Sequence, residues 1–354
     1  GCWLTVDTGL LGLTRTAGAW SQRVTTRAAW ERPMIAGTGD VFTLRAQGDA
    51  RGLLARNQEK LATPQPGVNG EHADGNLRLA LDWRRPMVRD AGEWGSQTIE
   101  PRLQFVTGPS TGRQTNFANE DSVDFEFTDA NLFQLNRFVG RDRYEGGTRV
   151  DGALRGAWNL PNGGRVEALA GRSFRFNESQ QFPANTGLDR QWSDYVARVG
   201  VAPVRWLDLT GRTRLDSQTD QHRQSEAVAR LDLGRVGPLE SVSIWGGYLY
   251  TPAVQLVASQ RERNEVSFGV AGRYQTRQGG QWRLSAQVRY DLVRHFSVLS
   301  APPGLYPDER LHSQIRMMGR FATDPTTGAD YAGNTVFLVR IGFKTVGDYF
   351  LRAI

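Results

Sequence analysis

The feature that most constrains the fold is a two-residue alternation of apolar and polar side chains, which recurs along the chain. In residues 77–84, leucine and tryptophan occupy the odd positions, whereas arginine, alanine and aspartate occupy the even ones. Residues 282–290 show the same alternation with the apolar side chains at even positions. Because successive side chains of a β-strand point to opposite faces, each stretch predicts a strand with one apolar and one polar face. Convincing helical spacing is absent, and the chain is predicted to be all-β.

The same reasoning predicts strands at 41–47, 77–84, 99–107, 149–160, 165–176, 195–202, 207–216, 226–234, 241–250, 266–276, 282–290 and 335–345. Turn sequences at 161–164, 204–206 and 278–280 predict antiparallel hairpins. Long polar links are expected at 51–75, 108–147, 177–193 and 294–335. Short periplasmic turns and long extracellular loops are typical of an antiparallel transmembrane β-barrel of the bacterial outer membrane.

The low hydropathy of the chain is compatible with a membrane location. Only 39% of the residues are hydrophobic, and no apolar run reaches the length of about 18 residues that a membrane helix needs. A membrane strand needs only about 10 residues with every second one apolar. Aromatic residues near the expected strand ends suit the interfacial girdles of a barrel: Trp20, Trp30, Trp83, Trp158, Trp206, Trp245, Tyr248, Tyr250, Trp282 and Tyr290. A β-sandwich with these aromatics in its core is the alternative fold.

The net charge of +6 comes almost wholly from arginine, because Lys60 and Lys344 are the only lysines. Nucleic-acid-binding proteins concentrate basic residues in a patch or helix, whereas here they are scattered among acids, which argues against a nucleic-acid partner. The single cysteine, Cys2, allows no internal disulfide, and the four histidines show no metal-ligand spacing. No cofactor, metal site or catalytic residue is expected. The lack of a clustered acid, base and nucleophile argues against an enzyme.

Three segments carry a family signature. Residues 100–105 read EPRLQF, residues 119–149 read NEDSVDFEFTDANLFQLNRFVGRDRYEGGTR, and residues 336–347 read VFLVRIGFKTVG. Together with residues 5–9 and 13–16, which fit in the same order, these segments resemble the lipopolysaccharide-assembly protein family (LptD). The resemblance covers most of the chain.

The resemblance picks out two groups of residues. Those that match the long middle signature are Asp121, Asp124, Asp129, Asn131, Phe133, Asn136, Arg137, Asp142, Arg143, Gly146 and Arg149. Those in the segment similar to the family's last strand, which by resemblance is one edge of a lateral gate, are Phe337, Val339, Arg340, Ile341, Phe343 and Lys344. A simpler interpretation of this second group is a closing strand that faces lipid.

The resemblance implies that residues 1–354 are the C-terminal β-barrel portion of an outer-membrane protein of Gram-negative bacteria, a partial barrel without the signal peptide and the N-terminal jelly-roll domain. The expected function is to insert lipopolysaccharide into the outer leaflet through a lumen and a lateral gate. The implied partners are lipopolysaccharide, an LptE-type plug lipoprotein, the periplasmic Lpt bridge through the missing domain, and the barrel-assembly machinery. A porin-like or receptor barrel for passive solute uptake is the alternative. The chain departs from the family at 296–318, where the family commonly has a cysteine pair and this sequence has none.

Several charged residues allow more than one interpretation. The acids Glu120, Asp121, Asp124, Glu126 and Asp129 contain the carboxylates that a divalent cation prefers, but a loop folded into the lumen and paired with Arg137, Arg141 and Arg143 is favoured. Some arginines expected on the polar face could bind lipid phosphates or simply form a polar wall in contact with water. These are Arg212, Arg214, Arg283 and Arg289. Asp194 and His222 could be imagined as part of a hydrolase triad, but their spacing does not support one.

Overall fold

The computed structural model describes residues 1–16, 18–60, 66–111, 114, 117–119, 121–122, 126–177, 181–184, 186–252, 262–275, 281–293, 295–301, 304–308, 311–323, 330–343 and 347–353, with the backbone alone described from residue 299 onward. These residues form antiparallel strands joined by turns, loops and three short 3-10 helices. The predicted all-β class is confirmed. None of the helices in the described ranges is long and apolar enough to cross a bilayer.

The strands are β1 (Trp3–Thr14), β2 (Trp20–Ile35), β3 (Val41–Arg56), β4 (Gly70–Arg84), β5 (Met87–Asp90), β6 (Ser96–Thr107), β7 (Arg149–Asn159), β8 (Arg165–Arg175), β9 (Tyr195–Val204), β10 (Leu207–Leu215), β11 (His222–Val236), β12 (Leu239–Thr251), β13 (Arg263–Gln275), β14 (Gln281–Asp291), β15 (Phe296–Ala301), β16 (Gly304–Asp308), β17 (Leu311–Thr323), β18 (Asp330–Phe343) and β19 (Gly347–Ala353). The 3-10 helices are η1 (Gln58–Lys60), η2 (Pro66–Val68) and η3 (Gly92–Trp94).

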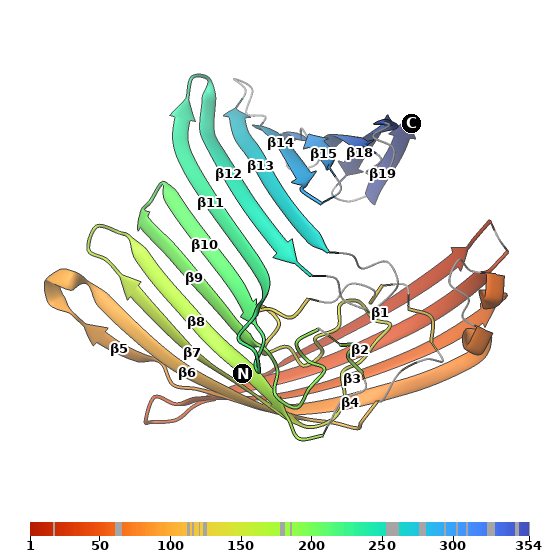
Figure 1. The fold of residues 1–354 in the computed structure, drawn as a ribbon, viewed down its shortest axis with the longest axis horizontal. Coiled ribbons are helices and arrows are strands. Elements are labelled where there is room, and N and C mark those ends of the chain that lie inside the picture. Colours follow the sequence, from red (N-terminus) through yellow and green to blue (C-terminus); the bar gives the residue numbers. More distant parts are fainter. Residues whose placement is uncertain are drawn as a thin grey trace.

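The strands form one sheet in which each strand pairs with its neighbours along the chain. Two local departures occur: β4 and β5 both pair with β6, and β15 and β16 both lie between β14 and β17. Among the described residues, β1 pairs only with β2 and β19 only with β18. The sheet curves strongly and encloses the loop that joins β6 to β7 (Figure 1). We call its concave side the inner face and its convex side the outer face.

The two faces of the sheet have the reverse of the polarity found in a soluble protein. On β4, the outer residues Leu77, Leu79 and Leu81 are 53%, 48% and 42% exposed. The inner residues Arg78 and Asp82, which alternate with them, are 1% and 2% exposed. Exposed leucines and buried charges on one strand contradict the alternative of a β-sandwich, whose apolar residues would fill the core.

The longest described connections lie at one end of the strands. Residues 57–69, 108–148 and 176–194 connect strands at that end, whereas short turns at 36–40, 160–164, 205–206 and 237–238 connect them at the other. Two of the three predicted tight turns are thereby confirmed, and residues 278–280 lie outside the described residues. Tryptophans gather near the short-turn end, as expected of a girdle: Trp83, Trp94, Trp158, Trp206 and Trp282. The prediction was wrong for Trp245, which lies in the middle of β12 and on the inner face.

Two predicted links are strands in the structure. In the link expected at 51–75, β3 continues to Arg56 and β4 begins at Gly70. The alternation fails at the end of β3 because Leu53 and Ala55, on the inner face, pack against Val68 and Phe117 and are therefore apolar. The link expected at 294–335 contains β15, β16, β17 and the start of β18, so this prediction was wrong too.

Candidate functional site

The loop of residues 108–148, here called the inner loop, fills much of the inner face. It leaves β6, folds back into the concavity and rejoins the sheet at β7 (Figure 1). Its described part carries an apolar cluster of Phe127, Leu132 and Phe138, which packs with Phe182, Leu188 and Val196. Of the two buried apolar clusters among the described residues, the larger therefore lies inside the curved sheet, where it fixes the loop to the wall.

The most buried polar contact of the inner loop is centred on Glu145. Its carboxylate is fully shielded from solvent and accepts a hydrogen bond from Nε of Arg137 at 2.8 Å. It also pairs with Arg149, at 3.2 Å, and with Arg175 of β8. Asp151 of β7, also fully buried, lies 3.0 Å from Arg149. A buried charge is tolerated only where it is paired and hydrogen-bonded, and here two carboxylates face three guanidinium groups.

This arrangement keeps Glu145 ionised. Burial by itself would raise the pKa of the carboxyl, but the guanidinium groups of Arg137, Arg149 and Arg175 favour the charged form more strongly, and the pKa is held well below its ordinary value. Loss of this one carboxylate would therefore leave the nearby guanidinium groups with too little negative charge around them.

A second contact fixes the loop to β3 and β4. The guanidinium of Arg51 lies between the rings of Phe117 and Tyr144, at 3.8 Å and 4.3 Å from the two centroids. Its Nε and one terminal nitrogen each donate to Asp74 at 2.7 Å. The Tyr144 hydroxyl donates to the same carboxylate at 3.0 Å, and burial raises the pKa of that hydroxyl above its ordinary value. This is a bidentate, stacked arginine of the kind that lysine does not replace.

A third contact reaches β2. Arg23 donates to Asp121 at 2.9 Å and also pairs with Asp142. Asp121 accepts backbone N–H bonds from Arg141 and Asp142, both at 3.0 Å. The backbone of Gly140 passes so close to Asp121 that a Cβ there would overlap it, and φ is +72°. Glycine is required at that turn for both reasons.

A fourth contact reaches β10 and β11. Asp129 lies 3.2 Å from Nε of Arg212, and Gln224 donates to Glu126. Burial raises the pKa of Asp129, and the nearby Arg212 lowers it only in part. With the pair of Arg141 and Asp7 on β1, the inner loop contacts strands from β1 to β11, and it holds together parts of the sheet that are distant in sequence.

The remaining signature residues support the same loop. Asn136 donates to the carbonyl of Arg143 and accepts from the N–H of Glu145, both at 2.9 Å. Asn131 binds the backbone of Thr128 and Glu126, the ring of Phe133 lies 4.0 Å from the Arg102 guanidinium, and Arg149 donates to the carbonyl of Gln134. Gly146 approaches Pro109 so closely that a Cβ would overlap its carbonyl. Asp124 lies outside the described residues.

For the acids that the structure describes, Asp121, Glu126 and Asp129, the expected partners within the loop were wrong, and Glu120 and Asp124 lie outside the described residues. The acids were predicted to pair with Arg137, Arg141 and Arg143. Instead, Arg137 binds Glu145, and Arg141 lies 2.8 Å from Asp7 of β1. Burial and the neighbouring Arg51 lower the pKa of the Arg143 guanidinium. The prediction assumed neighbours in sequence, whereas the partners of Asp121 and Asp129 come from the wall of the sheet.

The other charged residues singled out from sequence have ordinary structural partners. Arg214 is buried against Asp194 at 3.3 Å and donates to the carbonyl of Thr186 at 2.8 Å. Arg289 is 3.6 Å from Glu265. His222 contacts Ser225 at 2.5 Å, on the strand of His222 itself. Asp194 is thus engaged by Arg214, which gives no support to a triad.

Sequence reasoning missed one residue of the inner loop and several charged residues of the wall. Glu145 was not singled out, and neither were Arg23, Asp49, Arg51, Asp74, Arg78, Asp151 and Arg175, which hold the loop or one another. For most of the strand residues among them, the signal that could have found them is a charged side chain that alternates with small or apolar residues along a strand. Such a charge must be paired where it is buried.

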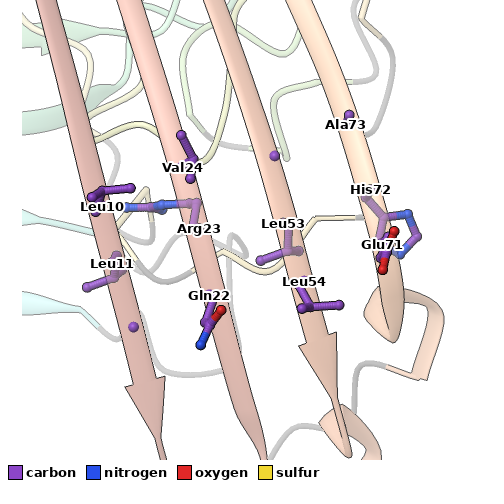
Figure 2. Close-up of a pocket in the computed structure, with 12 residues that line it drawn as sticks. Leu10, Leu11, Gln22, Arg23, Val24, Leu53, Leu54, Glu71, His72 and Ala73 are labelled. Carbon is purple, nitrogen blue, oxygen red and sulfur yellow. The ribbon is translucent and has the colours of Figure 1, made fainter.

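Two grooves flank this site. An inner groove of about 640 Å³ lies between β1, β2, β3 and residues 133–136 of the inner loop, and Arg27, Glu31, Arg45 and Gln47 are among its lining residues. A second groove, of about 650 Å³, crosses β1, β2, β3 and β4 toward their long-connection end, and Leu10, Val24 and Leu54 are among its lining residues (Figure 2). Gly12 and Gly52 also line it, and a Cβ at either position would have no atom within 4 Å. In the described part of the chain, no three His, Cys, Asp or Glu side chains are grouped as metal ligands would be.

Comparison with known proteins decides the family. The model of the family described as LptD, LPS transport system D, matches residues 4–295, which include β1 from its second residue, β2 to β14 and the whole inner loop. The chain belongs to the LptD family. The signature residues of this LptD chain, from Asp121 to Arg149, fall within the matched part.

Curated relatives agree with this LptD assignment. The chain is 30% identical over 199 residues to the LPS-assembly protein LptD of Nitrosomonas eutropha, which covers 54% of this chain and 26% of the relative. It is 25% identical over 268 residues to that of Paraburkholderia xenovorans, covering 73% of this chain and 32% of the relative. It is 26% identical over 243 residues to the LPS-assembly protein LptD of Azoarcus sp., covering 67% of this chain and 28% of the relative. This LptD chain spans only about a quarter to a third of the length of these relatives.

The residues expected at the lateral gate lie beyond the part that the family model matches. Phe337, Val339, Arg340, Ile341 and Phe343 belong to β18, and Lys344 lies outside the described residues. In this LptD chain β18 pairs with β17 on one side and with β19 on the other. Among the described strands, β19 rather than β18 is therefore the C-terminal edge.

Proposed function

We propose that this chain is part of the wall of an outer-membrane β-barrel that inserts lipopolysaccharide into the outer leaflet. The observation that carries the proposal is the family match over residues 4–295, which falls on a sheet with exposed leucines outside and buried charges inside. Lipopolysaccharide needs both environments. Its sugars and phosphates cannot cross hydrocarbon at low cost, whereas its acyl chains can contact an apolar outer face.

The position of the inner loop supports a sideways exit of the lipid. The loop leaves and rejoins the sheet at the long-connection end, which is the extracellular end in an outer-membrane barrel, and its ion pairs with β1, β2 and β10 hold it across the inner face. The acyl chains then leave between strands, and the edge strand β19, which pairs with β18, is one side of that gate in our proposal.

The partners follow from the same proposal. The inner groove, whose lining combines charged and polar residues of β2 and β3 with aromatic residues such as Trp30 and Phe133, is where we place a partner inside the lumen, such as the plug lipoprotein. Delivery from the periplasmic Lpt bridge requires an N-terminal domain outside residues 1–354, and insertion of the barrel requires the barrel-assembly machinery. The proposed location is the outer membrane, and the transport step makes and breaks no bond.

The proposal is tested by depleting the full-length protein in its host and following newly made lipopolysaccharide. We expect its arrival at the cell surface to fall while its synthesis continues. A plasmid copy of the full-length gene restores delivery and serves as the control. If surface delivery is unchanged while uptake of small polar solutes falls, the protein is a porin-like barrel and the proposal is wrong.

A further inference from the structure

One residue of the inner face is not what a polar wall that only contacts water would need. The register of β10 to β14 places Arg230, Trp245, Gly269 and Gln287 side by side on one face. That face is the inner one, because Arg212 and Gln224 of the same strands contact the inner loop. In the described part of β10 to β14, Trp245 is the one aromatic residue that the register places on this face.

The wall beneath Trp245 is shaped to hold its ring. Gly269 lies directly opposite Trp245 on β13, and a Cβ at Gly269 would overlap the six-membered ring of the indole. Gly269 is buried although its strand neighbours Phe268 and Val270 are exposed on the outer face. The indole therefore covers the glycine, and one face of the ring packs against the sheet.

Most of the inner side chains around Trp245 are small or polar. Ser243, Gly247, Ser267 and Ala271 are the small inner residues next to Trp245 and Gly269 on β12 and β13. Arg230 and Gln287, one and two strands away in the same row, are exposed. Arg230 lies 3.3 Å from Asp232, also exposed, and Arg289 lies 3.6 Å from Glu265. An aromatic surface is thus bordered by hydrogen-bond donors and acceptors.

From this geometry we infer that Trp245 is a stacking platform for a pyranose ring, and that Arg230 and Gln287 bind the hydroxyl or phosphate groups of the same saccharide. A sugar ring presents an apolar C–H face and a polar rim. The first matches an aromatic surface and the second matches charged and amide side chains. The inference deepens the proposed function, on which it rests, by naming the part of the lipopolysaccharide that contacts β11 to β14.

The position of Trp245 within its strand favours this ligand over membrane lipid. An aromatic residue of an interfacial girdle lies near a strand end and on the outer face. Trp245 lies in the middle of β12 and on the opposite face from Tyr248 and Phe268, which are exposed outside. A ring at this place contacts what passes through the lumen.

The test measures binding of soluble core oligosaccharide, freed of its acyl chains, to the purified full-length protein with its co-purifying partners. Saturation-transfer NMR detects the bound sugar. We expect Trp245→Ala to weaken binding about three- to tenfold, a typical effect for one aromatic contact, and Gly269→Val to have a similar effect because it displaces the ring. Trp245→Phe, which keeps an aromatic face, should bind more tightly than Trp245→Ala.

Trp282→Ala is the matched control, because Trp282 is a tryptophan of β14 that the register places on the outer face. It should bind the oligosaccharide like the parent protein. Heat-modifiable migration on gels verifies that each variant folds. If Trp245→Ala does not fold, binding is measured with Trp245→Phe instead. The inference is overturned if the parent shows no saturable binding, or if the folded Trp245 and Gly269 variants bind like the parent.

A second readout separates this inference from the proposed function. If depletion of the protein stops surface delivery of lipopolysaccharide but the Trp245 variants keep full saccharide affinity, only the stacking platform is wrong. If depletion leaves delivery intact, the proposed function fails and the platform as a lipopolysaccharide site fails with it. If the platform is right, Trp245→Ala also slows delivery of lipopolysaccharide with a full saccharide more than that of a saccharide-truncated form.

Discussion

Nε of Arg137 donates to the carboxylate of Glu145 at 2.8 Å, and both side chains are shut off from solvent. The two residues are close in sequence, but the carboxylate also meets Arg149 of β7 and Arg175 of β8. A contact within the loop is thereby joined to the wall. Glu145 is the residue on which docking of the inner loop depends most.

Replacing this carboxylate should release the loop. Glu145→Gln leaves three buried guanidinium groups short of negative charge, and breaking a buried ion pair in this way costs about 3–5 kcal/mol. We expect trypsin added to intact cells to cut the loop of the full-length variant at its arginines, while the parent resists. Glu71→Gln, at an exposed outer position of β4, is the matched control and should leave resistance unchanged. Equal resistance of Glu145→Gln and the parent would contradict the assigned role.

The pH dependence of loop docking follows from the same carboxyl. Its folded pKa lies below the ordinary value of 4.5, so its contribution is complete above that value and is lost as the pH falls toward the folded pKa. A spin label at residue 130 should be equally immobile from pH 7 to about pH 5 and become more mobile below about pH 4.5. In Glu145→Gln the acid-dependent part of this change should be missing. A loosening centred near neutral pH would point to another group.

Asp129 should behave differently, although it too is paired with an arginine. Burial raises its pKa, so its ionised form is disfavoured in the folded protein. Stability from such a group decreases as the pH rises through the folded pKa. We expect Asp129→Asn to change loop protection by less than about 1 kcal/mol, as measured by the same trypsin assay. A loss as large as that of Glu145→Gln would show that the Arg212 contact contributes far more than its environment suggests.

An arginine on the outer face should impair the barrel. Leu79 is 48% exposed, and in a soluble protein Leu79→Arg would be nearly neutral. In lipid the same change costs about 2–4 kcal/mol near the bilayer midplane. We expect less folded, heat-modifiable protein in the outer-membrane fraction. Gln218→Arg, in the exposed turn after β10, is the control and should accumulate like the parent.

The alternation predicted those strands whose outer side faces the apolar environment and whose inner side faces polar groups, as in residues 77–84. It failed where that contrast disappears. Leu53 and Ala55 are apolar on the inner face because Phe117 covers them, and residues 70–76 are polar or small on both faces. Trp245 was assigned to a girdle because the spacing of aromatics does not tell the middle of a strand from its end.

Some residues of the candidate site could be predicted from the sequence, but the contacts between them could not. The family signature marked Asp121, Asn136 and Arg137, and in the structure each makes a hydrogen bond that holds the inner loop. Their partners were not predictable, because contacts such as Arg23 with Asp121 join residues far apart in sequence. Such pairs are fixed by strand register and by the path of a long loop, and no local pattern encodes either of them.

The measurement that tests the account most directly is the environment of the outer face of β4. Nitroxide labels on single cysteines at 77, 79 and 81, in full-length protein with its native cysteines replaced, would be compared with labels at the inner positions 76 and 80. We predict that the outer labels collide with oxygen, which concentrates in lipid, and are shielded from a water-soluble nickel chelate, while the inner labels are shielded from oxygen. Free collision of the outer labels with the nickel chelate would place this face in water and contradict the account.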